Sequence, residues 1–177
     1  MTPIRILTAA AALLSLAACE TPTARSTGPA NPAEVAFVTN AYQIIKFDQE
    51  EGALAKAQAK DPRVLALAER LVNEANQFEA QLAPVAASAG ITPPNILRSD
   101  LRVRLGHMRL QHGLDFDRSY LDDQIASHEE ALRQEDAMKT QETGSSFADL
   151  AEHGEVLLKT NLQALRALRD DMSKPAS

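Results

Sequence analysis

The sequence predicts an all-α protein: a four-helix bundle with one short extra helix inserted between its second and third long helices. Aromatic residues make up only 4 % of the chain and tryptophan is absent. The recurring residues are Ala, Leu, Glu, Gln and Arg, which lose little on entering a helix. Apolar residues recur at steps of three and four along four long stretches, and Pro and Gly separate these stretches. A length of 177 residues with 45 % hydrophobic residues fits one domain with a buried core.

Residues 1–19 have the layout of a secretory signal. A cation, Arg5, precedes an apolar run over 6–16, and small residues follow up to Cys19. The run is shorter than the roughly 20 apolar residues that cross a bilayer. The last four residues, LAAC, resemble the bacterial lipobox, in which the cysteine is acylated and the peptide bond before it is cut. The alternative is an ordinary small-residue cleavage site that contains a cysteine. We expect Cys19 to carry the lipid, because the motif directly follows the apolar run. Several acyl chains would form a stable anchor, where a single chain is marginal.

Residues 20–31 are rich in Pro, Thr, Ser and Gly and show no apolar period, so we expect a flexible tether. Glu20 stands where an aspartate retains lipoproteins of this kind in the inner membrane, which favours the outer membrane. We therefore expect a protein of the bacterial cell envelope that faces the periplasm and contacts the membrane through Cys19. A net charge of −6 gives no general attraction to a phosphate backbone, so we expect no nucleic-acid partner.

The first two helices are predicted from their capping residues. Asn31, Pro32 and Glu34 fit N-cap, first-turn and capping-box positions, so a helix should start there and run to about Lys60. Asp61 followed by proline starts the next helix across a tight corner. That helix should continue to Gly90, unless Pro84 kinks or ends it early. Its apolar seam comprises Val64, Ala68, Leu71, Ala75, Phe78, Leu82 and Val85.

The segment ITPPN at 91–95 interrupts the chain, and a short amphipathic helix follows and ends at Gly113. Its arginines fall mostly off the apolar side, which is typical of a solvated face. They also permit a docking surface for a partner or an anionic glycan. These arginines are Arg98, Arg102, Arg104 and Arg109.

The last two long helices complete a bundle domain over 32–172. Asp115 can cap the third, which should run to about Glu142, and the fourth should extend from Phe147 to Met172. Residues 173–177 are expected to form a disordered tail.

Three polar residues should meet at mid-height of this bundle. Asp48, His128 and Asn161 each fall on the apolar seam of a different helix, and Ala75 occupies the same level on the second helix. Buried polar groups must be paired, so one interpretation is a hydrogen-bonded cluster that fixes helix register. An alternative is a divalent transition-metal site of a metal-binding or oxidative-stress protein, because helix bundles place carboxylate and imidazole ligands at this level. The candidate ligands are Asp48, Glu51, Glu74, His128 and Glu129.

The helices also resemble those of a known family. The stretches FVTNAYQIIKFDQEEGALA from Phe37, DPRVLALAERLVNEANQ from Asp61 and FDRSYLDDQIASHEEAL from Phe116 are similar to bacterial envelope proteins grouped as domain-of-unknown-function family 4142. The resemblance covers about residues 34 to 170. It implies a ferritin-like bundle in the cell envelope and no particular biochemical role. Its best single element is the pattern Phe116, Asp117, Arg118, Tyr120 and His128.

Some positions depart from the pattern of these relatives. They typically carry Asp-His in the second helix, where this chain has Glu74 and Ala75, and a histidine where it has Asn161. The acid of the first helix is usually glutamate and is Asp48 here. Of the inward histidines implied by the resemblance, only His128 is present.

No complete catalytic motif is found. The sequence HEEAL lacks the second histidine of a zinc-protease helix, since Leu132 stands in its place, and no Gly-rich phosphate loop, nucleophile elbow or paired cysteines occur. We therefore expect no catalytic residues, no cofactor, and a binding or structural role in the envelope.

Overall fold

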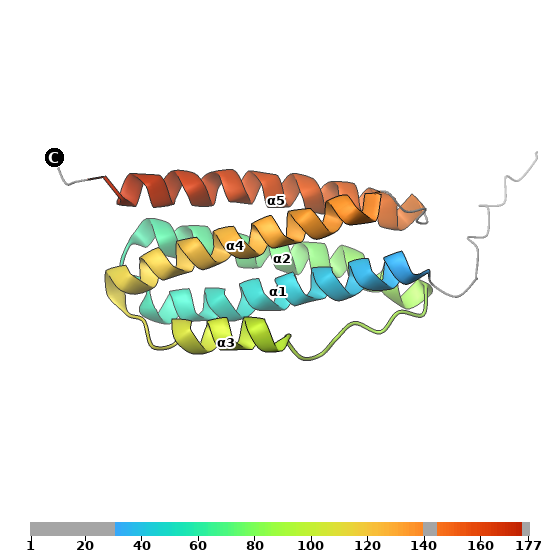
Figure 1. Cartoon of the computed structure of the whole chain (residues 1–177), viewed down its shortest axis with the longest axis horizontal. Helices are drawn as coiled ribbons and strands as arrows, with labels where there is room; N and C mark the ends of the chain where they lie inside the picture. Colours follow the sequence, from blue (N-terminus) through green and yellow to red (C-terminus); the bar gives the residue numbers. More distant parts are fainter. Residues whose placement is uncertain (1–30, 140–144, 175–177) are drawn as a thin grey trace, which may run out of the picture.

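The computed structural model describes residues 31–139 and 145–174, and within these ranges the regular elements are all α-helices (Figure 1). The all-α class expected from the sequence is confirmed. The expected signal peptide, Cys19, the tether up to residue 30 and the end of the tail at 175–177 lie outside the described residues. The helices are α1 (Pro32–Gln58), α2 (Pro62–Ser88), α3 (Ser99–Met108), α4 (Gly113–Lys139) and α5 (Ser145–Met172).

The starts of α1 and α2 follow the capping residues that the sequence predicts. The prediction for α4 is wrong: this helix begins at Gly113, so Asp115 lies inside its first turn and is not its cap. Asn31 Oδ1 accepts a hydrogen bond from the Glu34 N–H at 2.9 Å, and the Glu34 carboxylate accepts one from the Asn31 N–H at 3.1 Å. Asp61 caps α2 by accepting from the Arg63 N–H. Pro84 does not end α2, which continues to Ser88. A proline removes one helical hydrogen bond, and the burial of residues on either side of it holds the helix together.

The four long helices lie side by side, and each packs against two others. α1 contacts α2 and α4, and α5 contacts the same two helices. In Figure 1, α1 and α5 run in one direction and α2 and α4 in the other, so every neighbouring pair is antiparallel. The connection over 89–98 and α3 carry the chain back along the outside, which lets α4 start beside the corner between α1 and α2.

The described apolar core has two large parts, separated by polar residues, and a small third cluster of Phe47, Leu101 and Leu105 beneath α3. On α1, Ile45 belongs to one part and Ala55 to the other. Asp48 and Glu51 lie between them in the sequence and are both buried. The first part contains Phe37, Val38, Ala75, Phe78, Leu82 and Phe147; the second contains Val64, Leu71, Phe116, Tyr120, Leu121, Ile125 and Leu165.

Helix α3 packs on the outside of this core, against α1 and α4. Leu101 and Leu105 contact Phe47, and the Arg104 guanidinium lies 4.6 Å from the centre of the Phe47 ring. The Gln43 amide binds the segment 89–98, which precedes α3. It donates to the carbonyl of residue 96 at 3.0 Å and accepts from the N–H of residue 98 at 2.7 Å. Across the described ranges, no helix combines the length and the apolar character needed to cross a membrane.

Candidate functional site

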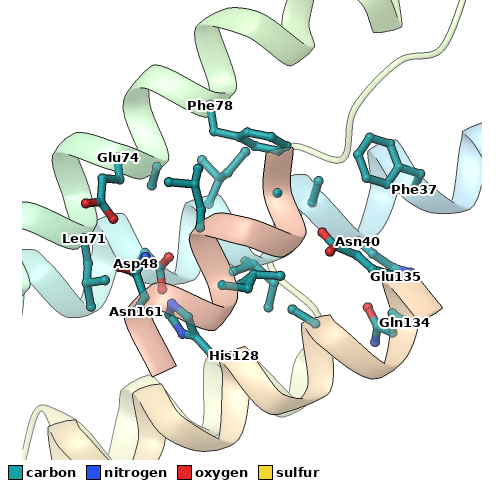
Figure 2. A pocket seen from close by; sticks show the side chains of 18 residues that line it. Phe37, Asn40, Asp48, Leu71, Glu74, Phe78, His128, Gln134, Glu135 and Asn161 are labelled. Carbon is teal, nitrogen blue, oxygen red and sulfur yellow. The ribbon is translucent and has the colours of Figure 1, made fainter. Parts of the chain in front are cut away.

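The structure brings the expected polar layer together around one pocket (Figure 2). Asp48 of α1, His128 of α4 and Asn161 of α5 line it, and Ala75 of α2 occupies the fourth side. The pocket has a volume of about 70 Å³. Each residue comes from a different long helix, so the pocket exists only when all four helices are packed.

The walls of the pocket are mostly apolar. Figure 2 shows Asp48, His128 and Asn161 gathered at one end, with Phe78 and Phe37 toward the other. The remaining apolar lining includes Ala41, Ile44, Ile45, Leu71, Ala131, Leu157 and Leu158. Three more polar residues, Asn40, Gln134 and Glu135, line the pocket near Phe37 (Figure 2). The pocket is therefore mostly apolar, with polar groups at both of its ends.

The imidazole of His128 is held as a neutral ring. Its Nδ1 donates to the backbone carbonyl of Gln124 at 2.9 Å, since a carbonyl can only accept, and this leaves Nε2 as the unprotonated nitrogen. Burial lowers the pKa of His128 to about 4, although the carbonyl and the negative charge of Glu74 act in the opposite direction. At neutral pH the ring therefore presents a lone pair and no positive charge.

The carboxyl group of Asp48 is buried and incompletely hydrogen-bonded. Burial raises the pKa of Asp48 to about 7; the Gln124 amide partly offsets this effect, and the charge of Glu74 adds to it. Within the described chain, Asp48 Oδ1 and Glu74 Oε2 have no hydrogen-bond partner. Two acceptor oxygens at the pocket are thus unsatisfied, which costs free energy unless a donor reaches them.

A bridge by Arg70 connects two helices beside the pocket. Its Nη1 donates to Glu74 Oε1 at 2.8 Å and to Asn161 Oδ1 at 2.7 Å. The expected polar layer therefore has a cationic member that spans α2 and α5.

A second set of buried polar groups leads from the pocket toward α3. Gln124 Nε2 donates to Glu51 Oε2 at 2.8 Å. Burial, followed by the neighbouring Asp123 carboxylate, raises the pKa of Glu51. Asp123 in turn accepts from Arg104 Nε of α3 at 2.5 Å. The pocket is thus connected through Glu51 to the side of the core on which α3 packs.

The five candidate metal ligands predicted from the sequence do not come together at one point in the structure. Glu129 is partly exposed and does not line the pocket; its carboxylate pairs with Arg166 of α5 at 2.6 Å. Glu51 is bound to Gln124, and Glu74 is held by Arg70. Among the described residues, no three His, Cys, Asp or Glu side chains are grouped closely enough to hold a metal ion.

The sequence reasoning missed two residues of this site, Arg70 and Gln124. Each lies four positions before a residue that was singled out, Glu74 and His128 respectively, so each shares a helix face with it. This spacing is the signal that could have identified them. It does not reveal that Arg70 reaches Asn161 on another helix, which depends on how α2 and α5 pack.

Comparison with known proteins identifies the family and the fold. The sequence matches the family described as "Domain of unknown function (DUF4142)" over residues 19–168. No curated protein matches it. The structure is similar to the crystal structure of a DUF305 fragment from Deinococcus radiodurans, with a TM-score of 0.73 and 16 % sequence identity, covering 81 % of this chain and 99 % of that chain. At this identity the likeness shows the fold alone.

Proposed function

The chain belongs to the DUF4142 family. We propose that it is an exported, lipid-anchored envelope protein whose helices form a binding module facing the periplasm. The binding site is the pocket at the polar layer, and its ligand is a small molecule that donates hydrogen bonds. The observation that carries the binding role is the pair of unpartnered acceptor oxygens, Asp48 Oδ1 and Glu74 Oε2, at a mostly apolar pocket.

The anchoring part of the proposal rests on the first 19 residues. Arg5, the apolar run over 6–16 and Cys19 stand in the order of a lipoprotein signal, and the family match begins at residue 19, after the run. Glu20 favours the outer membrane over the inner one. The antiparallel packing of the four long helices supports a ferritin-like four-helix bundle as the form of the module.

The chemistry of the pocket limits the ligand. A volume of about 70 Å³ is roughly half of the 150 Å³ cavity that accommodates benzene, so a ligand has roughly three or four non-hydrogen atoms. Three carboxyl groups, those of Asp48, Glu74 and Glu135, are among the lining residues. They accept hydrogen bonds and repel anions when ionised, so the pocket favours a donor such as a small amide or amine.

Acetamide and acetate test this specificity, because they have the same shape and differ in whether they donate. At pH 8, where Asp48 is mostly ionised, acetamide should raise the melting temperature and acetate should not. A ligand at 100 times its dissociation constant adds about 2.7 kcal/mol to the free energy of unfolding. Asp48→Asn should abolish the effect of acetamide, whereas the exposed carboxyl variant Asp115→Asn should preserve it. Equal responses to the two ligands would contradict a preference for hydrogen-bond donors. No response to either would indicate that the polar layer only sets helix register.

The anchor is tested separately in a bacterial host. Globomycin should cause an unprocessed precursor to accumulate, and Cys19→Ala should release the processed chain from the membrane fraction. Full membrane retention of Cys19→Ala would contradict lipid anchoring, and it would leave the ligand experiment unaffected.

A further inference from the structure

The outward side of α3 and its flanks carries an exposed apolar stripe. Ile96, Val103 and Leu110 are 62 %, 58 % and 78 % exposed. They are spaced by seven residues, which is close to two helical turns. Val103, within α3, and Leu110, just after it, therefore lie on the same side of the helix. The inward residues Leu101 and Leu105 are buried against the core. This short helix is therefore apolar on two sides, and only one of them is covered.

Cationic side chains lie on the flank of this stripe that faces α1, whereas Asp100, three residues before Val103, lies on the other flank and pairs with Arg98 at 3.5 Å. A groove of about 490 Å³ between α1 and α3 is lined by Lys46, Arg102 and Arg109 together with one acidic residue, Glu50. Across residues 31–139 and 145–174, neither Lys46 nor Arg102 forms an ion pair, and Arg109 has only an exposed contact of 3.4 Å with Glu50. The other described arginines are all ion-paired; they are Arg63, Arg70, Arg98, Arg104, Arg118, Arg133, Arg166 and Arg169.

The groove has a net positive charge, whereas the whole protein has a net negative charge. The chain has a net charge of −6, whereas the groove carries three cations and one anion. Arginine binds phosphate oxygens with paired donors, and lysine adds a point charge. Apolar side chains beside such cations are the arrangement by which a helix lies in a membrane interface, with its cations at anionic headgroups.

We propose that the surface formed by Lys46, Ile96, Arg102, Val103, Arg109 and Leu110, the α3 surface, docks on an anionic phospholipid membrane. Its cations contact the headgroup phosphates, and its apolar stripe enters the boundary between headgroups and acyl chains. The proposal goes beyond the pocket and needs no lipid on Cys19. If Cys19 is acylated, the 11 residues between it and Asn31 can span roughly 40 Å, which would keep the α3 surface near the same membrane.

The absence of tryptophan allows a local test. Val103→Trp places a single indole on the α3 surface, and Val156→Trp places one on α5 at the same exposure of 58 %. The full, unacylated chain of each variant is titrated with phosphatidylglycerol vesicles and with phosphatidylcholine vesicles. We expect a blue shift of the emission only for Val103→Trp and only with phosphatidylglycerol. Equal shifts at the two positions would mean that another segment, such as the apolar run over 6–16, binds the vesicle, and no shift at Val103→Trp would equally overturn the proposal.

The role of the cations is tested in the Val103→Trp background. Arg102→Gln with Arg109→Gln should weaken partitioning onto phosphatidylglycerol roughly 30-fold, and added salt should weaken it further. Arg118→Gln, which alters an exposed arginine on α4, is the control and should leave partitioning within about twofold. Glycerol 3-phosphate without vesicles separates a soluble anion from a lipid headgroup. A saturable spectral change with glycerol 3-phosphate alone would assign the groove to a soluble ligand and refute membrane docking.

Discussion

At the residue scale, the polar layer contains a carboxyl group and an imidazole whose pKa values are in the reverse of their usual order. Burial raises the pKa of Asp48 to about 7 and lowers that of His128 to about 4. Both shifts have the same primary cause, because burial disfavours the charged form of either group. At neutral pH the layer therefore holds an uncharged imidazole beside a carboxyl group that is close to its midpoint.

These shifts give opposite dependences of stability on pH. Unfolded Asp48 titrates near 3.8, so between pH 4 and 7 the folded state binds more protons, and the contribution of Asp48 is lost as the pH rises. Unfolded His128 titrates near 6.5, so the folded state binds fewer protons, and its contribution is lost as the pH falls from 6.5 to 4. Glu51, with its raised pKa, acts in the same direction as Asp48.

Asp48→Asn should therefore change the pH profile of stability. It removes the component that falls with pH, so the free energy of unfolding should increase from pH 4 to 7 relative to the wild type. The relative change should be on the order of 2 to 4 kcal/mol, given about 1.4 kcal/mol per pKa unit. Urea unfolding at several pH values measures it. Asp115→Asn, at an exposed position, should give a profile parallel to the wild type, and a parallel profile for Asp48→Asn would contradict a raised pKa.

At the element scale, close approaches fix how neighbouring helices meet. Asp117 of α4 accepts the N–H groups of Lys60 and Asp61 at 3.0 and 2.8 Å, so α4 holds the corner between α1 and α2. Farther along, Gly52 of α1 faces Val72 of α2, and a Cβ at Gly52 would lie 2.2 Å from Val72 Cγ2. The absence of a side chain at Gly52 therefore sets the spacing of α1 and α2.

Gly52→Ala should destabilise the protein by roughly 1–3 kcal/mol, because a β-branched neighbour with one preferred rotamer cannot move aside cheaply. Gly106→Ala provides the matched control. Gly106 is also helical, but nothing lies within 4 Å of the added Cβ. Its replacement should stabilise α3 by roughly 0.5–1 kcal/mol through helix propensity alone. Thermal unfolding of the two variants compares them directly, and equal effects would refute the close approach of α1 and α2.

At the scale of the whole molecule, the connection through α3 decides which helices become neighbours. A short turn after α2 would place the next helix antiparallel to it. The segment over 89–98 and α3 instead return the chain, so α4 runs parallel to α2 and packs on α1. Through Leu101, Leu105 and the pair of Arg104 with Asp123, α3 is attached to both α1 and α4.

Leu101→Ala should consequently destabilise the whole chain and not α3 alone. The buried side chain of Leu101 contacts the core, so its truncation should cost roughly 2–5 kcal/mol, with one cooperative transition by both circular dichroism and hydrogen exchange. Leu110→Ala, which alters an exposed leucine, should remain within roughly 0.5 kcal/mol of the wild type. A separate early transition for α3 would show instead that it is only loosely attached.

Local sequence signals predicted the starts of α1 and α2 and the level of the polar layer, although they misplaced the start of α4, which begins at Gly113 and not at Asp115. Asn31 and Asp61 mark helix starts because a side-chain oxygen caps nearby N–H groups, and Asp48, His128 and Asn161 share the apolar phase of their helices. Both signals are local, since they depend on neighbours within one or two turns. The family resemblance was likewise readable from helix-length patterns and is confirmed by the match over residues 19–168.

Only the tertiary structure decided which side chains meet across helices. Helical phase places a residue on a face and leaves its partner on another helix open, because the partner depends on rotation, register and close approaches such as that at Gly52. For this reason Glu129 was expected among the candidate ligands near His128, whereas its carboxylate pairs with Arg166 of α5. The bridge from Arg70 to Asn161 was missed for the same reason. The unpaired cations beside α3 likewise emerge only when the positions of all acidic partners are known.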